Sequence, residues 1–303
     1  MSIAAAQTAE SIELLAGAGR LRDSLALLRS NKLALLGTTV TLAFILVGLL
    51  GAVIVLVPSL QHLYLDQNLS AALRRPFSPG HILGTDNFGR DMAWRVAAGT
   101  GISLLVGLAV TGLSVLLGMA LGAIAGYFRG ATDSVISAVI DLTWGFPLLL
   151  VAVIAVGILQ PGLTPVIVAV ALVNWAGFAR IIRAETMSLR EREFVEAARA
   201  LGVSNLRILV RHIVPNTIAA TLVMSSYYVA YTVIAEAGLS FIGMGAQPPT
   251  PSLGQMIASG RDYLYVDSWM AIIPGIAIAL IVLGLNTLGD GLRDIFDPRM
   301  RRW

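Results

Sequence analysis

Long apolar runs, separated by shorter polar and charged segments, are the main pattern along the chain. Each run is close to the length that a spanning helix needs, because about 20 residues at 1.5 Å per residue cross a hydrocarbon core about 30 Å thick. The runs therefore predict an all-α membrane protein with about six membrane-spanning helices. We place these helices at residues 33–57, 102–128, 134–159, 165–178, 213–235 and 268–288.

The composition agrees with a membrane protein and excludes several kinds of chemistry. Of the 303 residues, 56% are hydrophobic and 13% are charged, whereas soluble proteins average about 25% charged; the mean hydropathy is +0.80. The absence of cysteine excludes disulfides and thiolate sites, and the three scattered histidines lack metal-ligand spacing, so we expect no metal. No basic stripe interleaved with aromatic residues indicates nucleic-acid binding. Glu10 and Glu13 argue against a cleavable signal peptide.

The distribution of basic residues predicts the orientation of the helices. An even number of spans places both ends of the chain on the same side, and basic residues gather on the cytoplasmic side of membrane proteins. With both ends inside, the cytoplasmic segments hold all of the 21 Lys and Arg residues except Arg74, Arg75, Arg90, Arg95 and Arg261. We therefore expect cytoplasmic N and C termini.

This topology divides the chain into four segments. Residues 1–32 are expected to be cytoplasmic, with Leu21, Leu25 and Leu28 at helical spacing, either in an amphipathic surface helix or in the first turns of the next helix. Residues 33–96 hold the first transmembrane helix and an extracytoplasmic loop. Residues 97–290 form a transmembrane domain of five helices with a cytoplasmic loop at 180–215, and residues 291–303 form a cytoplasmic tail.

A glycine repeat marks one face of the second predicted span. Gly118, Gly122 and Gly126 follow one another at intervals of four residues. Such residues lie on the same face of a helix, so this face lacks side chains and lets another helix approach closely. We expect close helix packing here rather than ligand binding.

The loop at residues 180–215 has a helical pattern although it is too charged to lie in lipid. Phe194, Val195, Ala198 and Leu201 form an apolar stripe on one predicted helix, and Gly202 suits a C-cap with positive φ. A second helix follows and leads to residue 215. An apolar stripe on a cytoplasmic loop either binds a partner protein or packs back against the spans of the same chain, and the pattern alone leaves both readings open.

Motifs in this loop resemble a known family of transport proteins. The resemblance is to the EAA loop of the permease subunits of binding-protein-dependent ABC importers, and it rests on Glu196-Ala197-Ala198, then Gly202, then His212-Ile213-Val214-Pro215-Asn216. His212 stands where the generic ending has isoleucine, and this form resembles the dipeptide/oligopeptide/nickel branch. Residues 83–91, 236–249 and 286–299 are similar to further blocks of that branch, so the likeness covers nearly everything from about residue 31 onward.

The resemblance implies the type I ABC importer permease fold and a multi-pass protein of the cell inner membrane. In that family the EAA loop forms a coupling helix that docks on the ATPase, and the matching positions here are Glu196, Ala197, Ala198, Leu201, Gly202 and Pro215. The implied partners are a second homologous permease, two ATP-binding subunits, an extracytoplasmic substrate-binding protein and membrane lipid. The implied cargo is a short peptide, or a related small solute such as a nickel complex or an opine.

The sequence lacks the usual site for ATP. A P-loop needs a lysine after a Gly-rich turn, and the only lysine is Lys32, which no such turn precedes. We therefore expect a non-catalytic subunit without a cofactor of its own, with ATP and Mg²⁺ bound by the partner ATPase subunits.

Charged residues toward the outer side are candidates for a gate or for contact with the binding protein. These are Asp86, Arg90, Asp91 and Glu236. Turn-stabilising hydrogen bonds are the alternative for the first three, and capping of the following turn is the alternative for Glu236. Asp141 lies within the third predicted span, where a carboxylate is costly and therefore a functional candidate, with a structural role as the alternative.

Two other classes of function have weaker support in the sequence. A secondary transporter would need ionisable groups near the bilayer midplane and an internal repeat, but Asp141 and Glu236 lie toward span ends and no clear repeat is present. An intramembrane enzyme would need a catalytic constellation, and the sequence has no cysteine, no paired histidines and no Gly-x-Ser-x-Gly elbow. The importer subunit is the favoured interpretation.

Overall fold

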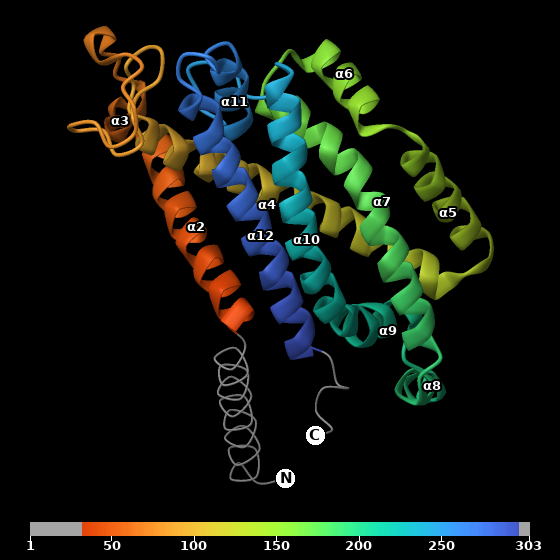
Figure 1. Cartoon of the computed structure of the whole chain (residues 1–303). Coiled ribbons are helices and arrows are strands. Elements are labelled where there is room, and N and C mark those ends of the chain that lie inside the picture. The colour runs from red at the N-terminus through yellow and green to blue at the C-terminus, as the bar shows by residue number, and fades with distance from the viewer. Residues whose placement is uncertain (1–31, 297–303) are drawn as a thin grey trace.

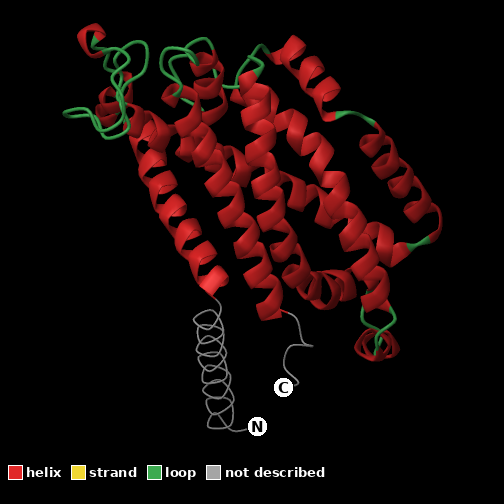
Figure 2. Ribbon diagram, viewed as in Figure 1, coloured by secondary structure: helices red, strands yellow, loops and turns green. Residues whose placement is uncertain are grey.

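The computed structural model describes residues 32–296, with side chains from residue 38 to residue 294. Within this range the secondary structure is helical, joined by loops, and no strand is formed (Figure 2). The helices are α2 (Lys32–Leu56), α3 (His62–Leu65), α4 (Met92–Phe128), α5 (Gly130–Gly145), α6 (Leu148–Leu159), α7 (Leu163–Arg190), α8 (Glu193–Ala200), α9 (Asn205–Ile208), α10 (Val214–Phe241), α11 (Leu253–Arg261) and α12 (Trp269–Phe296), with 3₁₀ turns at Pro58–Leu60 and Leu69–Ala71 and a π-helical stretch at Leu209–Ile213.

The long helices lie side by side, and their ends define two opposite sides of the molecule (Figure 1). The start of α2, the end of α12, α8 and α9 lie at the lower side of the view, whereas α3, α11 and the end of α6 lie at the upper side. Five helices are long and apolar enough to cross a membrane, and the bent pair α5 and α6 brings the number up to six. This confirms the predicted all-α fold with about six spans.

The third predicted span is broken rather than straight. The axes of α5 and α6 differ in direction by 86°. The break lies at Phe146, whose backbone is extended with φ −86° and ψ 124°, and at Pro147. Proline lacks an N–H and disfavours the helical conformation of the preceding residue, so α5 ends there. The single helix predicted at 134–159 is corrected to two shorter helices that meet at a corner.

Four other helices extend beyond their predicted bounds: α10 ends at Phe241 rather than near residue 235, α12 ends at Phe296 rather than near residue 288, and α4 and α7 are also longer. α4 begins at Met92 rather than near residue 102, because the Asp91 side chain caps its first turn by accepting hydrogen bonds from the backbone N–H groups of Ala93 and Trp94. The proposed division at residues 96 and 97 therefore falls inside α4. α7 continues to Arg190, so its inner end carries charges that we placed in the loop. The predicted amphipathic helix within 1–32 lies outside the described residues, apart from Lys32.

The glycine repeat of α4 lies against another helix, as predicted, and the structure shows that this helix is α7. A Cβ atom added at Gly118 would lie 2.5 Å from Cβ of Phe178, and one added at Gly126 would lie 2.5 Å from the carbonyl oxygen of Arg183. Real Cβ contacts are longer than this, so only glycine permits the two backbones to approach this closely. The α4–α7 pair is therefore tightly packed.

Candidate functional site

The predicted cytoplasmic loop folds as α8, a tight turn and α9. Glu193 and Glu196 lie in the first turn of α8 and Arg199 lies in its last turn, where each charge is favourable to the helix dipole. Gly202 has φ +77°, its N–H bonds to the carbonyl of Arg199 at 3.0 Å, and the N–H of Val203 bonds to the carbonyl of Ala198 at 3.1 Å. These two bonds form a Schellman cap, which confirms the predicted C-cap at Gly202.

The sequence left open whether the apolar stripe of α8 binds a partner protein or packs against its own chain. In the structure one half of the stripe is buried and the other half is exposed. Val195 is fully buried and Ala198 is nearly so, and both pack on the cluster that contains Ile208, Leu209 and Ile213. Phe194 and Leu201 point away from this cluster and are 42% and 83% exposed. One half of the stripe therefore holds α8 on its own protein, and the other half forms an outward apolar surface.

The docking residues predicted from the resemblance also include both exposed and buried side chains. Glu196, Ala197, Leu201 and Gly202 are exposed, and positions 194, 197 and 201 share one face of the helix. Ala198 lies beneath them as part of the support. Pro215 is exposed at the start of α10, away from α8 along the chain. The outward surface is thus defined by Phe194, Glu196, Ala197, Leu201 and Gly202.

Polar contacts attach this loop to the inner end of α4. The Tyr127 hydroxyl donates to Oδ1 of Asn205 at 2.8 Å, and Nη2 of Arg129 donates to Oε1 of Glu191 at 2.5 Å. The hydrogen bond from Arg129 lowers the pKa of Glu191 below its usual value, so the pair is charged at neutral pH. The loop is consequently fastened at both of its ends to the same helix.

A π-helical stretch joins the loop to α10. Residues Leu209–Ile213 form this stretch, just before Pro215. Proline cannot donate a backbone hydrogen bond and crowds the preceding turn of a helix, and a widened turn relieves that conflict. The side chain of Asn216 donates to the carbonyl of His212 at 2.6 Å and satisfies a polar group at the break. The EAA-loop ending therefore forms a continuous but irregular connection into a spanning helix.

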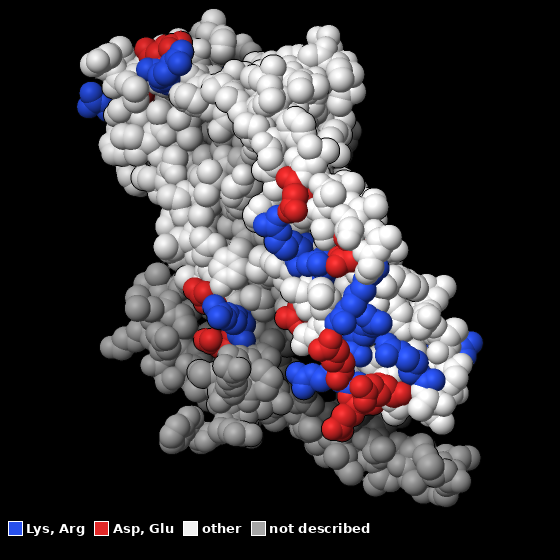
Figure 3. Space-filling view, turned by 90° about the vertical axis from the view of Figure 1, so that its right-hand side faces the viewer, with Lys and Arg blue, Asp and Glu red and all other residues white. Residues whose placement is uncertain are grey.

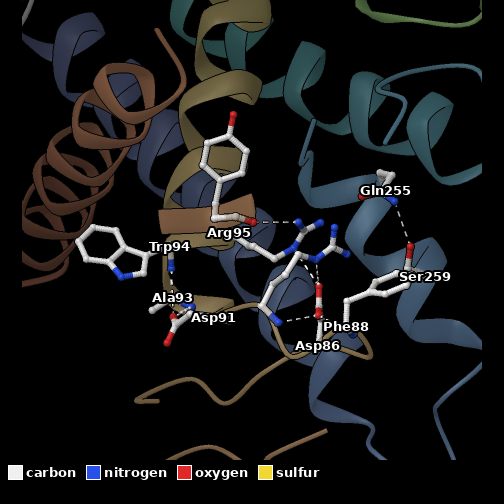
Figure 4. A network of polar contacts seen from close by, with 10 residues as sticks. Asp86, Phe88, Asp91, Ala93, Trp94, Arg95, Gln255 and Ser259 are labelled. Carbon is white, nitrogen blue, oxygen red and sulfur yellow. Dashed lines mark hydrogen bonds and ion pairs between the residues drawn. The ribbon is translucent and has the colours of Figure 1, made fainter. Parts of the chain in front are cut away.

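On the opposite side of the molecule, Asp86 organises the outer loop between α3 and α4. Its carboxylate accepts hydrogen bonds from the backbone N–H groups of Phe88 and Arg90 at 2.8 and 3.0 Å. It also pairs with Nε of Arg90 at 2.7 Å and with Nε of Arg95 at 3.3 Å. Figure 4 shows the side chains of Arg95 and Asp86 pointing toward each other. Sequence reasoning missed the role of Arg95, since nothing local marks it as a partner of Asp86.

Asp91 and Arg90 also serve the loop itself. Asp91 caps α4 and its Oδ2 lies 2.7 Å from Nδ1 of His81. Arg90 is largely buried, with its guanidinium carbon 4.7 Å from the centre of the Phe88 ring. The structure thus supplies the turn-stabilising bonds that were the alternative for Asp86, Arg90 and Asp91, and their contact with a binding protein stays a prediction.

Glu236 lies in the interior between α4 and α10. Its side chain is 0% exposed and accepts hydrogen bonds from the hydroxyls of Ser103 at 2.9 Å and Ser240 at 2.7 Å. Ser240 in turn accepts a bond from the N–H of Ala246 at 3.1 Å, which ties the turn after α10 to the same group. In this conformation Glu236 joins two spans and braces the following turn, and a role in gating stays a prediction.

Asp141 receives a partner that the sequence did not reveal. Its Oδ1 accepts a hydrogen bond from Nη2 of Arg180 on α7 at 2.8 Å. A second ion pair joins the same two helices, with Nη2 of Arg183 at 2.7 Å from Oδ2 of Asp133. Two ion pairs therefore join α5 to α7.

A bundle of apolar helices with a capped helical loop at one end is the architecture of a multi-pass membrane protein. Residues 118–302 match the family described as binding-protein-dependent transport system inner membrane component. The chain belongs to this family, and is thus a non-catalytic permease of the inner membrane in a binding-protein-dependent ABC importer. The matched range includes α8 and Glu236 and begins after the Asp86 loop.

Curated relatives and a solved structure agree with this assignment. The chain is 39% identical to the dipeptide transport system permease protein DppC of Alkalihalophilus pseudofirmus, over 92% of this chain and 90% of that protein. It is 41% identical to a putative peptide transport system permease protein of Brucella suis, over 77% and 79%. It is 39% identical to the glutathione transport system permease protein GsiD of Pectobacterium atrosepticum, over 74% of each. An inward-facing structure of the MetNI methionine ABC transporter shares the fold, with a TM-score of 0.55 and 18% identity, over 68% of this chain and 98% of that one.

Proposed function

We propose that this chain moves short peptides across the cytoplasmic membrane, driven by separate ATPase subunits that dock on α8. The names of the relatives support the peptide class, since they refer to dipeptides, peptides and glutathione at 39–41% identity. A second homologous permease, two ATP-binding subunits and an extracytoplasmic binding protein complete the proposed transporter. ATP and Mg²⁺ are bound by the ATPase subunits.

The outward surface of α8 is the observation that carries the docking proposal. Phe194, Ala197 and Leu201 present apolar area outside the spanning helices, and an exposed apolar patch of this kind supports contact with a partner. Glu196 lies beside them and can pair with a basic residue of the ATPase. The small side chain of Ala197 lets the partner approach the helix backbone.

The attachments of the loop support a mechanism for coupling. Closure of the ATPases around nucleotide would displace α8, and the bonds of Tyr127 and Arg129 would carry that displacement to α4. The π-helical connection would carry it to α10. The spans then rock as rigid bodies between two states whose populations nucleotide binding biases.

Uptake by the complete transporter in proteoliposomes tests this function. We expect import of a labelled dipeptide that requires ATP, the extracytoplasmic binding protein and a hydrolysis-competent ATPase. Import that persists with a hydrolysis-dead ATPase, driven by a proton gradient alone, would contradict the proposal.

A further inference from the structure

The face formed by α5 and α7 carries charge at a depth where other faces are apolar. Arg180 follows the uncharged stretch 163–179, which at 1.5 Å per residue is about 25 Å long and so places Arg180 near the inner edge of a hydrocarbon core about 30 Å thick. The side chains of Arg180 and Asp141 are nevertheless 45% and 71% exposed. Figure 3 shows charged residues gathered on this face and extending from its lower part toward its middle.

Exposure of these charges to lipid is unfavourable. Charged side chains within spanning segments are rare and almost always face a water-filled cavity or other protein. The exposed residues of α6, by contrast, are apolar, as in Leu149, Val153 and Ile158. The face with Arg180 and Asp141 therefore borders water or protein rather than lipid.

A cavity of about 400 Å³ opens between the end of α5 and the middle parts of α7 and α10. Its volume falls in the range of about 300–1,000 Å³ that is typical of small-molecule sites. The walls are mainly aromatic, with one amide, and consist of Trp144, Val173, Asn174, Tyr227, Tyr228 and Tyr231. Aromatic faces receive apolar side chains, and tyrosine hydroxyls exchange hydrogen bonds with amides, so the lining suits an amphipathic solute.

The aromatic wall is held in place by neighbours. The hydroxyl of Tyr228 lies against Gly177, where a Cβ would collide with it, and its ring centre is 4.4 Å from that of Phe178. The Tyr227 hydroxyl donates to Oδ1 of Asp290 on α12 at 2.6 Å. Tyr231 is 46% exposed, with its ring 6.5 Å from that of Tyr228. Two tyrosines are therefore fixed, and the third is open to a ligand.

Arg180 supplies a positive charge beside this wall. Its guanidinium carbon lies 4.1 Å from the ring centre of Trp144, which lines the cavity. Arginine has five N–H donors in a planar fork, and the bond to Asp141 engages one of them. An incoming carboxylate can thus bind Arg180 in competition with Asp141, in the charge-assisted geometry that arginine favours.

We propose that this cavity is a transient site for a short peptide with a free terminal carboxylate, which Arg180 binds while Trp144 and Tyr231 contact its apolar side chain. This inference rests on the proposed function, since it assigns part of the pathway for the same cargo. Competition from Asp141 keeps binding weak, which a translocation site requires because the solute must also leave.

Binding to the purified, assembled transporter in nanodiscs, without the binding protein, tests the site directly. The probes are labelled alanyl-phenylalanine and its C-terminal amide. We expect the amide to bind the wild type about tenfold more weakly, Arg180→Gln to weaken binding of the free acid about tenfold, and the two probes to bind that variant equally. Arg180→Lys should recover part of the loss, and Tyr231→Ala should weaken both probes.

Asp141→Asn separates a ligand role from a structural one. Removal of the competing carboxylate should tighten binding of the free acid, opposite in sign to Arg180→Gln. Arg261→Gln, which breaks an exposed ion pair with Asp262 on the outer side, is the matched control and should change nothing. If Asp141→Asn and Arg180→Gln both weaken binding, or both release the second permease during purification, the ion pair is structural and the proposed site is wrong.

The uptake assay keeps the two proposals apart. A wild-type transporter that imports alanyl-phenylalanine while neither probe binds the nanodisc complex, or while the Arg180 variants bind as the wild type does, would overturn the site alone. A wild-type transporter that imports no peptide with ATP and binding protein present would overturn the proposed function, and this site with it.

Discussion

The Tyr127 hydroxyl at the inner end of α4 donates a hydrogen bond to the Asn205 side chain at the start of α9, at 2.8 Å across 78 positions of sequence. With the contact between Arg129 and Glu191, this bond attaches both ends of the α8 region to one spanning helix. In the proposed coupling mechanism, a displacement of α8 would be passed to α4 through these polar contacts as well as through apolar packing.

Tyr127→Phe should loosen the α8 region without unfolding the protein. The change removes one hydrogen bond, worth about 1 kcal/mol, and so should speed local amide exchange in residues 193–208 about fivefold. Tyr265→Phe is the control, because Tyr265 is fully exposed in the outer loop. Exchange measured by mass spectrometry checks this, and equal rates in both variants would show that the bond does not hold the loop.

Leu201→Asp should prevent association with the ATPase while leaving membrane insertion intact. The side chain is 83% exposed, so a carboxylate there costs the isolated chain little but places charge within the proposed apolar contact. We expect at least a tenfold loss of co-purified ATPase, with peptide uptake lost as well. Leu69→Asp, at a 71% exposed leucine of the outer loop, is the matched control. Retention of the ATPase at wild-type levels would show that α8 does not dock through this face.

Gly202→Ala should destabilise the turn between α8 and α9. An added Cβ meets nothing within 4 Å, so the expected cost of about 1–2 kcal/mol arises from φ +77° and not from crowding. Gly112→Ala makes the same change at an exposed helical glycine with equally open space and should not destabilise. Thermal unfolding of the purified subunit distinguishes the two, and equal midpoints would contradict the strain argument.

Asp86→Asn should open the outer loop. It leaves two buried arginines without their counter-charge, which costs about 3 kcal/mol or more, so limited proteolysis should cut the loop much faster. Asp66→Asn, at an exposed aspartate near the start of the same loop, should have no such effect. If Asp86→Asn leaves proteolysis unchanged but abolishes docking of the binding protein, the carboxylate acts on that partner rather than on the loop.

The spans, the cytoplasmic loop and its glycine cap could be predicted because each depends on residues that are close together in the sequence. Length and hydropathy define a spanning helix, and the cap at Gly202 depends only on the residues around it. The corner at Pro147 was harder, since proline alone does not separate a kinked helix from a broken one. The contacts that α6 makes with α7 are remote in sequence from the corner, so no local pattern reports them.

The contacts of Glu236 with Ser103 and of Asp141 with Arg180 could not be predicted, since these partners are remote in sequence. Ser103 lies 133 positions from Glu236, and Arg180 lies 39 positions from Asp141. Which half of the apolar stripe of α8 is buried could not be predicted either, because burial of Val195 depends on the position of α9 and the π-helical stretch. The hydrophobic pattern identifies the apolar face of α8, and only the fold determines which half of that face remains exposed to a partner.

The close contact between α4 and α7 at the glycines should make the two helices one long rigid unit. With 37 residues, α4 is about 55 Å long at 1.5 Å per residue. Backbones that touch at Gly118 and Gly126 cannot slide past one another without collision, so the two helices should tilt together. A tilt of about 5° about the inner end would move the outer end by about 5 Å, so a small change of angle on the cytoplasmic side would become a displacement of several ångströms on the outer side.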